Sequence, residues 1–452
     1  MKDLTQGNIV KTFFLFGFPL VIAGLLSQSY ATINSIIAGK YLGEHGLAAT
    51  GSIGPLITFT NAIVWGYNTG FGIYIAKLFG SKQYSKIKSS IYTNIVVMFI
   101  FCALLAVFLI AFNKPIFDAL NVKDELRADA LSYFIISIAF KFVLMAPNLF
   151  VMVLQGFGLG TFPLVVSLIS GFLSVIANII SVTILKMGVS GLAVSSVIVG
   201  AITSMLYFFK LRVCFKEMNV HKEKVKLGFS HIKESLSYAV PSMLQQGVMY
   251  LAGLTISPLV NKLSKSELAS RSIADKLYDI LATVYQNSTR AFTNYAAQCT
   301  GHKEYKKIKK GIVVGLIQSS CFLFPFLLAC VVFARPVCGL FLNKEAAPET
   351  IVYAMNFARI YLPFVYLNLF NNLFHGLYRA VKANVHLFVT TLFGALARFV
   401  ATAIFIGGMH IYGFFLGWVI AWAAELVLTT ILYFLGKWNP ERKEPKLEEA
   451  CQ

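Results

Sequence analysis

Apolar residues occur along this chain in long blocks, and short polar stretches separate them. A helix needs about 20 mostly apolar residues to cross the ~30 Å hydrocarbon core of a bilayer. Twelve blocks reach this length, at roughly 13–38, 47–78, 91–112, 128–153, 163–185, 188–211, 235–260, 267–299, 311–334, 350–374, 385–408 and 411–435. The pattern predicts an all-α integral membrane protein of twelve transmembrane helices.

The composition agrees with this prediction. Of the 452 residues, 57% are hydrophobic and 13% are charged, whereas soluble domains carry about 25% charged residues. The first apolar block is too long for a signal-peptide core and no small-residue cleavage site follows it, so we expect no cleavable signal peptide. The cysteines form no Cys-x-x-Cys pair and are interpreted as packing residues, neither disulfides nor metal ligands; they are Cys102, Cys214, Cys299, Cys321, Cys330, Cys338 and Cys451.

The 39 Lys and Arg residues are shared unevenly between the two alternating sets of loops. Most of them lie at the N-terminus, in 79–90, 210–234, 300–310 and 375–384, and in the tail. The positive-inside rule therefore places both termini in the cytoplasm. We expect these loops to face membrane lipid and no nucleic acid, because they fall where topology alone requires positive charge.

An internal repeat organises the chain. Three pairs of landmarks recur in the same order, and the two members of each pair are separated by almost the same length of chain: the Lys-rich segments 80–91 and 301–312, the prolines Pro19 and Pro241, and the loops 188–191 and 410–413. Each copy holds six helices, an even number, so both copies enter the membrane from the same side. Parallel repeats of this kind place a substrate site between the halves, near the midplane of the membrane.

The repeat divides the sequence into four parts. Residues 1–209 are predicted to form an N-terminal six-helix lobe, and 235–436 a C-terminal six-helix lobe. We expect 210–234 to be a basic cytoplasmic linker and 437–452 a cytoplasmic tail. The two lobes are expected to rock against each other as bodies.

Several motifs resemble those of one transporter family. They are Phe18-Pro19-Leu20 and 28–43 in the first helix, 76–80 after the second, 154–158 after the fourth, 240–246 in the seventh, 301–305 after the eighth and 378–380 after the tenth. Together they resemble bacterial multidrug and toxic compound extrusion (MATE) transporters, within the wider multidrug/oligosaccharidyl-lipid/polysaccharide exporter superfamily. The resemblance implies a V-shaped pair of bundles with helices 1, 2, 7 and 8 lining a central cleft. It also implies export of amphipathic compounds across the bacterial plasma (inner) membrane against inward flow of H⁺ or Na⁺.

The sequence departs from this family at the acidic positions that the resemblance leads us to expect. The positions for carboxylates in helices 1, 7 and 10 hold Asn34, Met249 and Asn368. An asparagine does not exchange a proton near neutral pH, although its carbonyl oxygen can ligate Na⁺. The usual coupling residues therefore cannot be carried over to this chain.

The polar groups within the predicted helices are the candidate site residues, because polar groups are costly in a bilayer. In helix 8, Asp275, Asp279, Gln286, Arg290 and Asn294 fall within a sector of about 100°. We interpret Asp279, Asp275 and Asn34 as candidates for ion coupling. The candidates for substrate binding are Tyr30, Asn34, Asn61, Trp65, Asn68, Gln246, Tyr250, Gln286 and Arg290. The alternative for each of them is a packing or interhelical hydrogen-bonding role.

Four more charges lie deep in predicted helices: Lys141, Arg359, Arg398 and Glu425. Arg398 and Glu425 are expected to form a structural ion pair. Lys141 has no deep acidic partner in the first six helices, and such a lysine loses its proton, faces water or awaits an anion. His375, His386 and His410 share no metal-ligand spacing, no GxxxxGK[ST] loop is present, and no set of residues suggests an enzyme. We therefore expect no cofactor beyond the coupling ion.

Three functions fit these observations. The first is a monomeric secondary-active exporter of amphipathic organic compounds or drugs. The second is a flippase for lipid-linked oligosaccharide or lipid, which the missing carboxylates favour and in which Lys141 and Arg290 would meet a pyrophosphate. The third is a non-transporting scaffold or receptor, which would require a degenerate cleft.

Overall fold

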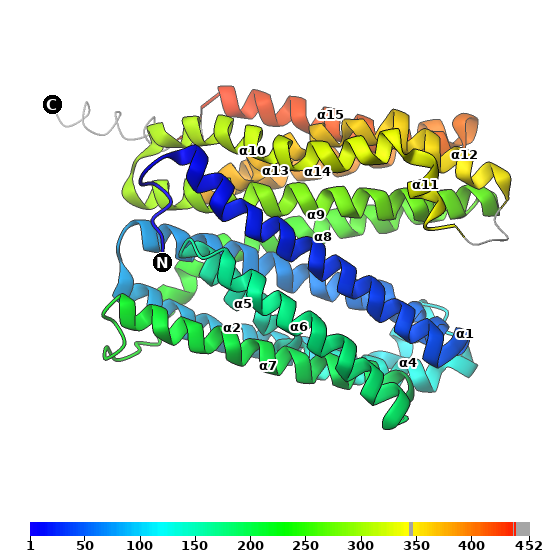
Figure 1. The fold of residues 1–452 in the computed structure, drawn as a ribbon, viewed down its shortest axis with the longest axis horizontal. Coiled ribbons are helices and arrows are strands. Elements are labelled where there is room, and N and C mark those ends of the chain that lie inside the picture. Colours follow the sequence, from blue (N-terminus) through cyan, green and yellow to red (C-terminus); the bar gives the residue numbers. More distant parts are fainter. Residues whose placement is uncertain (343–346, 437, 440–452) are drawn as a thin grey trace. The chain divides into compact units, whose positions relative to one another are not determined.

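The structure is a computed structural model that describes residues 1–342, 347–436 and 438–439 (Figure 1). In chain order its helices are α1 Ile9–Gly80, α2 Tyr84–Ala111, α3 Asn113–Ala119, α4 Asp124–Ala139, α5 Lys141–Gly156, α6 Thr161–Ile179, η1 Ile180–Ile184, α7 Gly188–Glu217, α8 Phe229–Val260, α9 Lys265–His302, α10 Tyr305–Val332, α11 Ala334–Gly339, α12 Pro348–Asn356, η2 Phe357–Tyr361, η3 Leu362–Phe364, α13 Val365–Ala380, α14 Asn384–Met409 and α15 Ile411–Phe434. Apart from Trp438 and Asn439, the predicted tail 437–452 lies outside the described residues, as does Cys451.

The twelve predicted spans can be followed through these helices. α1 contains the first two, and its backbone breaks at Gly43 (φ 65°, ψ −166°), in a region that glycine adopts without steric cost. α4 and α5 form the fourth span with a bend of 47°, and Pro348–Ala380 is the tenth. α2, α6 with η1, α7, α8, α9, α10, α14 and α15 each correspond to one of the others.

The predicted fold class is confirmed: the protein is an all-α multi-pass membrane protein. Within the described ranges, eight helices are long and apolar enough to span a membrane, and the bent α4–α5 pair makes nine. In this count α1 appears once, although it contains two spans. α8 and α9 are more polar and are not included in the count; with them the number of spans is consistent with twelve.

The chain forms two compact units. The first unit comprises Met1–Asp3 and Ile22–Met243, and the second comprises Leu4–Val21 and the chain from Leu244 onward. The start of α1 therefore belongs to the second unit, where Gln318 Nε2 donates to the Phe13 carbonyl oxygen at 2.9 Å. α7 and α8 both extend into the range expected to be a linker, which leaves 218–228 between them.

Each unit contains a close crossing between the second and the fourth span. A Cβ added to Gly156 would lie 3.0 Å from the carbonyl oxygen of Gly72. At the matching place in the second unit, a Cβ on Gly376 would collide with the side chain of Thr293. The two crossings stand in nearly the same relation along the chain as the landmarks of the sequence repeat, so the repeat is also a repeat of packing. Small residues permit such close approach between membrane helices.

The segment after α7 is fastened to α2 by one lysine. Lys88 is 8% exposed, and its Nζ donates to the carbonyl oxygens of Val220, His221 and Glu223 at 3.0, 2.9 and 2.6 Å. The Lys226 amide also donates to Ser89 Oγ at 3.2 Å. These bonds hold the segment 218–228 against the first unit by backbone contacts.

Glu234 makes a second attachment in the same unit. It accepts from Lys86 Nζ at 2.6 Å and from the Tyr74 hydroxyl at 2.7 Å. Burial raises the pKa of the Glu234 carboxyl, but the hydrogen bonds from Lys86 and Tyr74 outweigh burial and hold this pKa below its ordinary value. Glu234 therefore stays ionised at neutral pH and continues to hold the start of α8 to α1 and α2.

We expect Lys88→Met to loosen the segment 218–228, because three carbonyl oxygens lose a charged donor, a loss of about 1–3 kcal/mol. Limited trypsin digestion of the purified protein should then cut faster after Lys222, Lys224 and Lys226. Lys114→Met removes an exposed lysine elsewhere in the first unit and serves as the control. Equal cleavage rates in the two variants would contradict this role of Lys88.

Candidate functional site

In the first unit, the predicted amides serve as links between helices. Asn34 Nδ2 donates to Ser174 Oγ at 3.0 Å, which joins α1 to α6. Asn68 Nδ2 donates to Asn148 Oδ1 at 3.2 Å and to the Met145 carbonyl oxygen at 3.3 Å, which joins α1 to α5. The Oδ1 atoms of Asn34 and Asn68 are buried and accept no hydrogen bond among the described residues. Each amide thus has a nitrogen that links two helices and a buried oxygen without a hydrogen-bond partner among the described residues.

Lys141 lies at the break between α4 and α5 and is 1% exposed. Its Nζ donates to Asn61 Oδ1 at 2.8 Å, so one of the predicted site residues holds it. Among the described residues no ion pair with a carboxylate is present at Lys141, and the Asn61 amide oxygen is its hydrogen-bond partner.

The two aromatic candidates of the first unit are half-buried. Tyr30 packs against Gly171 and lies with its ring centroid 6.5 Å from that of Phe172, which fixes α1 to α6. Trp65 lies one turn before Asn68 on α1.

In the second unit, the polar residues of α9 do not act as one group. Asp275 forms an ion pair with Arg271 at 3.5 Å, Asp279 is exposed, and Asn294 donates to the carbonyl oxygen of Arg290 at 2.9 Å. Gln286 is half-buried, like Gln246 and Tyr250 on α8. The structure brings Asp275 to a basic partner on its own helix and leaves Asp279 outside that pair.

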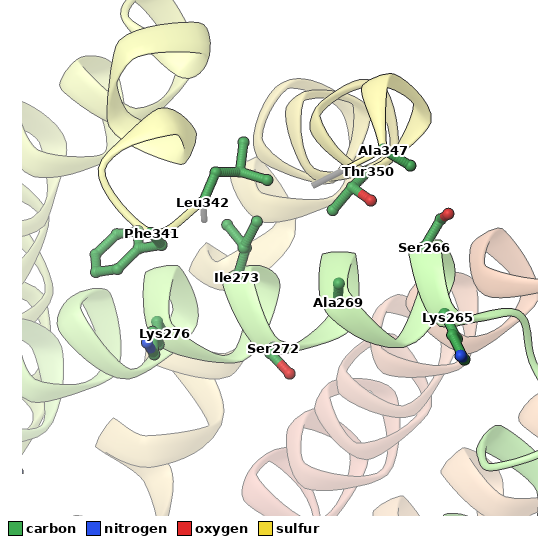
Figure 2. Close-up of a pocket in the computed structure, with 10 residues that line it drawn as sticks. All are labelled: Lys265, Ser266, Ala269, Ser272, Ile273, Lys276, Phe341, Leu342, Ala347 and Thr350. Atoms are coloured by element: carbon green, nitrogen blue, oxygen red, sulfur yellow. The ribbon is translucent and has the colours of Figure 1, made fainter. Parts of the chain in front are cut away.

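A cavity of about 530 Å³ lies along the first turns of α9 (Figure 2). Its wall includes Lys265 and Lys276 from α9, with Phe341 and Thr350 opposite. Asp275 and Asp279 are not part of its wall. The candidate carboxylates and this cavity are therefore separate features.

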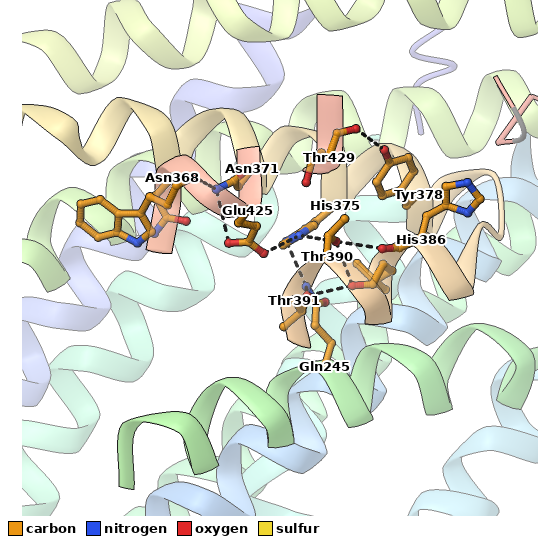
Figure 3. Close-up of polar contacts among 12 residues, drawn as sticks. Gln245, Asn368, Asn371, His375, Tyr378, His386, Thr390, Thr391, Glu425 and Thr429 are labelled. Carbon is orange, nitrogen blue, oxygen red and sulfur yellow. Dashed lines mark hydrogen bonds and ion pairs between the residues drawn. The ribbon is translucent and has the colours of Figure 1, made fainter. Parts of the chain in front are cut away.

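A buried polar cluster lies between α8, α13, α14 and α15 (Figure 3). His375 Nε2 lies 3.2 Å from Glu425 Oε1, and the two side chains are 6% and 11% exposed. Asn371 Nδ2 donates to Glu425 Oε2 at 3.3 Å and to the Trp422 carbonyl oxygen at 3.0 Å. A buried charge needs such partners, because lipid and apolar side chains offer none.

Gln245 connects this cluster to a cation. Its Nε2 lies 3.0 Å from His375 Nδ1 and donates to Thr391 Oγ1 at 3.0 Å, while its Oε1 accepts from Arg379 Nη2. Gln245 is fully buried, whereas its neighbour Gln246, which the sequence singled out, is half-buried. Adjacent helical residues point about 100° apart, so only one of the two can face the cluster.

The expected ion pair between Arg398 and Glu425 is wrong. Glu425 pairs with His375, and the Arg398 guanidinium lies over the ring of Trp418, 4.9 Å from its centroid. Arg398 and Glu425 nevertheless line the same small pocket of about 90 Å³, together with Met249, Asn368 and Tyr278. The arginine lies over an aromatic face, which attracts a cation, and the carboxylate faces the histidine.

This pocket adjoins two of the three positions where the family resemblance led us to expect carboxylates. Met249 supplies part of the wall, and Asn368 Nδ2 donates to the hydroxyls of Tyr278 and Tyr285 at 2.8 and 2.9 Å. The acidic group of the pocket comes from α15 instead. Sequence reasoning missed His375 and Gln245 as parts of this site, although both lie in or beside motifs that carried the resemblance, at 378–380 and 240–246.

Within the described ranges, no group of three or more His, Cys, Asp or Glu residues could hold a metal ion. None of the six cysteines in those ranges forms a disulfide. Amide carbonyl oxygens, such as those of Asn34 and Asn68, are ligands that hard cations accept.

The family model described as MatE matches residues 19–180 and again 241–404. The chain belongs to the MatE family. The two matches begin at Pro19 and Pro241, the pair of prolines that the sequence repeat relates. Each half of this MatE chain is therefore one copy of the family unit.

Similar proteins include multidrug resistance and export proteins of Bacillus subtilis and Staphylococcus haemolyticus. "Probable multidrug resistance protein YoeA" of Bacillus subtilis is 22% identical over 353 residues, 75% of each chain. "Multidrug export protein MepA" of Staphylococcus haemolyticus is 25% identical over 290 residues, 61% of this chain and 62% of that one. "Probable multidrug resistance protein YpnP" of Bacillus subtilis is 20% identical over 97% of each chain.

Solved structures share the fold of this MatE protein. An outward-facing MATE transporter of the MOP superfamily matches with a TM-score of 0.88 and 18% identity, over 98% of this chain and 99% of that one. A MOP superfamily transporter from Pyrococcus furiosus, described as having a binding pocket of reverse polarity, matches with a TM-score of 0.86 and 18% identity over 96% of each chain. At 18% sequence identity these matches show a shared fold.

We expect Gln245→Leu to destabilise the protein, because it leaves Arg379 and His375 buried without their shared partner. Leaving a buried polar group without its hydrogen-bond partner costs roughly 1–3 kcal/mol. Thermal unfolding of the detergent-purified protein measures the effect, and Gln246→Leu is the matched control on the adjacent residue. Equal melting temperatures for the two variants would show that the hydrogen bonds of Gln245 do not stabilise the protein.

Proposed function

We propose that this protein is a secondary-active exporter of amphipathic organic compounds or drugs, coupled to Na⁺ or H⁺ influx. The observation that carries the proposal is the double match of the MatE family unit, once in each half of the chain. The names of the relatives, which describe multidrug resistance and multidrug export, support the substrate class. Parallel copies of one unit are the architecture in which a site between two halves opens alternately to each side.

The first unit supplies the candidate surface for an organic substrate. The free Oδ1 atoms of Asn34 and Asn68 offer acceptors, and Tyr30 and Trp65 offer half-buried aromatic faces. Aromatic and amide groups suit a ligand that is partly apolar and often cationic. In the second unit we propose Gln246, Tyr250, Gln286 and Arg290 for the same role.

The coupling groups proposed from the sequence are Asp279, Asp275 and Asn34. Asp279 is the strongest of the three, because Asp275 already forms an ion pair with Arg271 and Asn34 carries no charge. We also propose that the protein works as a monomer in the bacterial plasma membrane. The distribution of basic loops supports cytoplasmic positions for both termini.

One observation favours the second candidate, a flippase for lipid-linked oligosaccharide or lipid. Lys141 is a buried cation that an amide holds and no described carboxylate neutralises. A phosphate group of a lipid-linked substrate would supply the missing negative charge. Lys141→Met would then abolish transport of a phosphate-bearing lipid, whereas an exporter of cationic compounds would retain activity.

The decisive experiment is ethidium efflux from proteoliposomes that contain the purified protein, under an imposed H⁺ or Na⁺ gradient. An exporter moves the dye faster with one gradient than with none. If neither gradient accelerates efflux, and a fluorescent lipid-linked oligosaccharide changes leaflet instead, the flippase is the correct function.

We expect Asp279→Asn to reduce ethidium export by about tenfold, the lower end of a typical coupling between two ligands. The reason is that the variant removes a charge that no partner on α9 neutralises. Everted vesicles at matched expression provide the measurement, and Glu125→Gln, which removes an exposed carboxylate in the first unit, provides the control. Export at the control rate would exclude Asp279 from coupling.

A further inference from the structure

The buried pair of His375 and Glu425 has no part in the function proposed so far. We propose that Glu425 exchanges the coupling proton in the second unit, and that His375 is a positioning residue that holds the Glu425 carboxylate. The proposal rests on the proposed export function and names a coupling group that Asp279, Asp275 and Asn34 do not include. The coupling ion at this site is then H⁺.

The direction of the hydrogen bonds identifies the titrating group. Gln245 Oε1 accepts from Arg379, so its Nε2 faces His375 Nδ1 and donates to it. A ring nitrogen that accepts carries no proton, so the proton of the neutral imidazole lies on Nε2, which donates to Glu425 Oε1. A second proton on His375 would lie on Nδ1, and this N–H would then face the N–H donor of Gln245 Nε2. The place for an added proton is therefore the carboxylate of Glu425.

One side of the carboxylate lines the pocket of about 90 Å³ between α8, α9, α13, α14 and α15. A polar pocket of this size has room for water. The adjacent Asn371 is fully buried, and its Oδ1 has no partner among the described residues. If the Asn371 amide turns, its Oδ1 can therefore accept a hydrogen bond from a protonated Glu425.

Other charged groups surround the pair from each packed helix. Arg398 on α14 lines the same pocket, Arg379 on α13 acts through Gln245, and Tyr278 on α9 contributes its hydroxyl to the wall. The charge of Asp275 is already balanced by Arg271. Arg398 supplies a fixed positive charge at the pocket, so the ionised state of Glu425 is compensated whenever its proton has left.

The exchange itself involves one proton. Water on one side of the membrane gives a proton to a Glu425 oxygen, which converts the carboxylate to a carboxylic acid and raises the charge of the pocket by one. After the two halves have changed their opening, the acid returns the proton to water on the other side and becomes a carboxylate again. No other bond forms or breaks.

Infrared difference spectroscopy of the purified protein between acidic and neutral pH tests the titration without any transport. We expect a protonated-carboxyl band that disappears in Glu425→Gln and persists in Glu267→Gln. Glu267 is the matched control, because it is a buried glutamate of the same unit that caps the start of α9. A carboxyl band that Glu425→Gln leaves unchanged would overturn the proposal.

Ethidium transport in proteoliposomes tests the coupling. A pH gradient should accelerate efflux in the unchanged protein, and we expect this acceleration to fall by about tenfold or more in Glu425→Gln. Dye exchange without a gradient should continue. Glu425→Asp, which retains a carboxyl group, should recover part of the coupled rate. If Glu425→Gln keeps its response to the pH gradient, or if only a Na⁺ gradient drives the unchanged protein, Glu425 does not carry the coupling ion.

Two further variants test the positioning role of His375. His375→Gln keeps a donor toward Glu425 and should shift the pH dependence of efflux more than its maximum rate. Gly394→Ala would place a methyl group 3.0 Å from Glu425 Oε2 and should shift it as well. Unchanged pH profiles in both variants would show that the cluster is structural. If the unchanged protein transports no dye under any gradient, the exporter proposal fails, and the infrared result alone decides whether Glu425 titrates.

Discussion

A bilayer offers no hydrogen-bond partners, and this constraint shapes every polar residue within the helices of this protein. The structure meets it by turning polar side chains into links between helices: Asn34 to Ser174, Asn68 to Asn148, and Gln245 to both His375 and Arg379. A polar group in such a helix must find its partner inside the protein. The same links define where a ligand can meet the chain, because each leaves some atoms unsatisfied.

The two halves are copies that have diverged in their charges. Both keep the close crossing of the second and fourth spans, at Gly156 in the first unit and Gly376 in the second. The first unit holds a buried cation, Lys141, beside an amide, and the second holds a buried carboxylate, Glu425, beside a histidine. Packing was retained because a side chain at the crossing would collide, whereas the polar residues were free to change as long as each found a partner. This divergence underlies our proposal that the second half carries the coupling ion.

Much of the architecture could be predicted from the sequence. Twelve apolar blocks, the internal repeat and the MATE-like motifs led to the all-α membrane fold and to the family, because these signals depend on the bilayer thickness and on local steric needs. The boundaries of the helices differ from the prediction. α1 runs through two spans and is interrupted at Gly43 alone among its residues. α7 and α8 extend into the range 210–234, because charged residues beyond an apolar block can continue a helix in water.

The sequence by itself determined the number of spans, the repeat, the absence of the usual carboxylates at Asn34, Met249 and Asn368, and the isolation of Lys141. Only the tertiary structure decided which polar groups meet. It paired Glu425 with His375 instead of Arg398, and it chose Gln245 over Gln246. The physical reason is that helix periodicity and hydrophobicity are local properties of the chain. A buried hydrogen-bonded pair, in contrast, depends on the rotation of several helices about their axes, and a shift of one residue along a helix turns a side chain by about 100°.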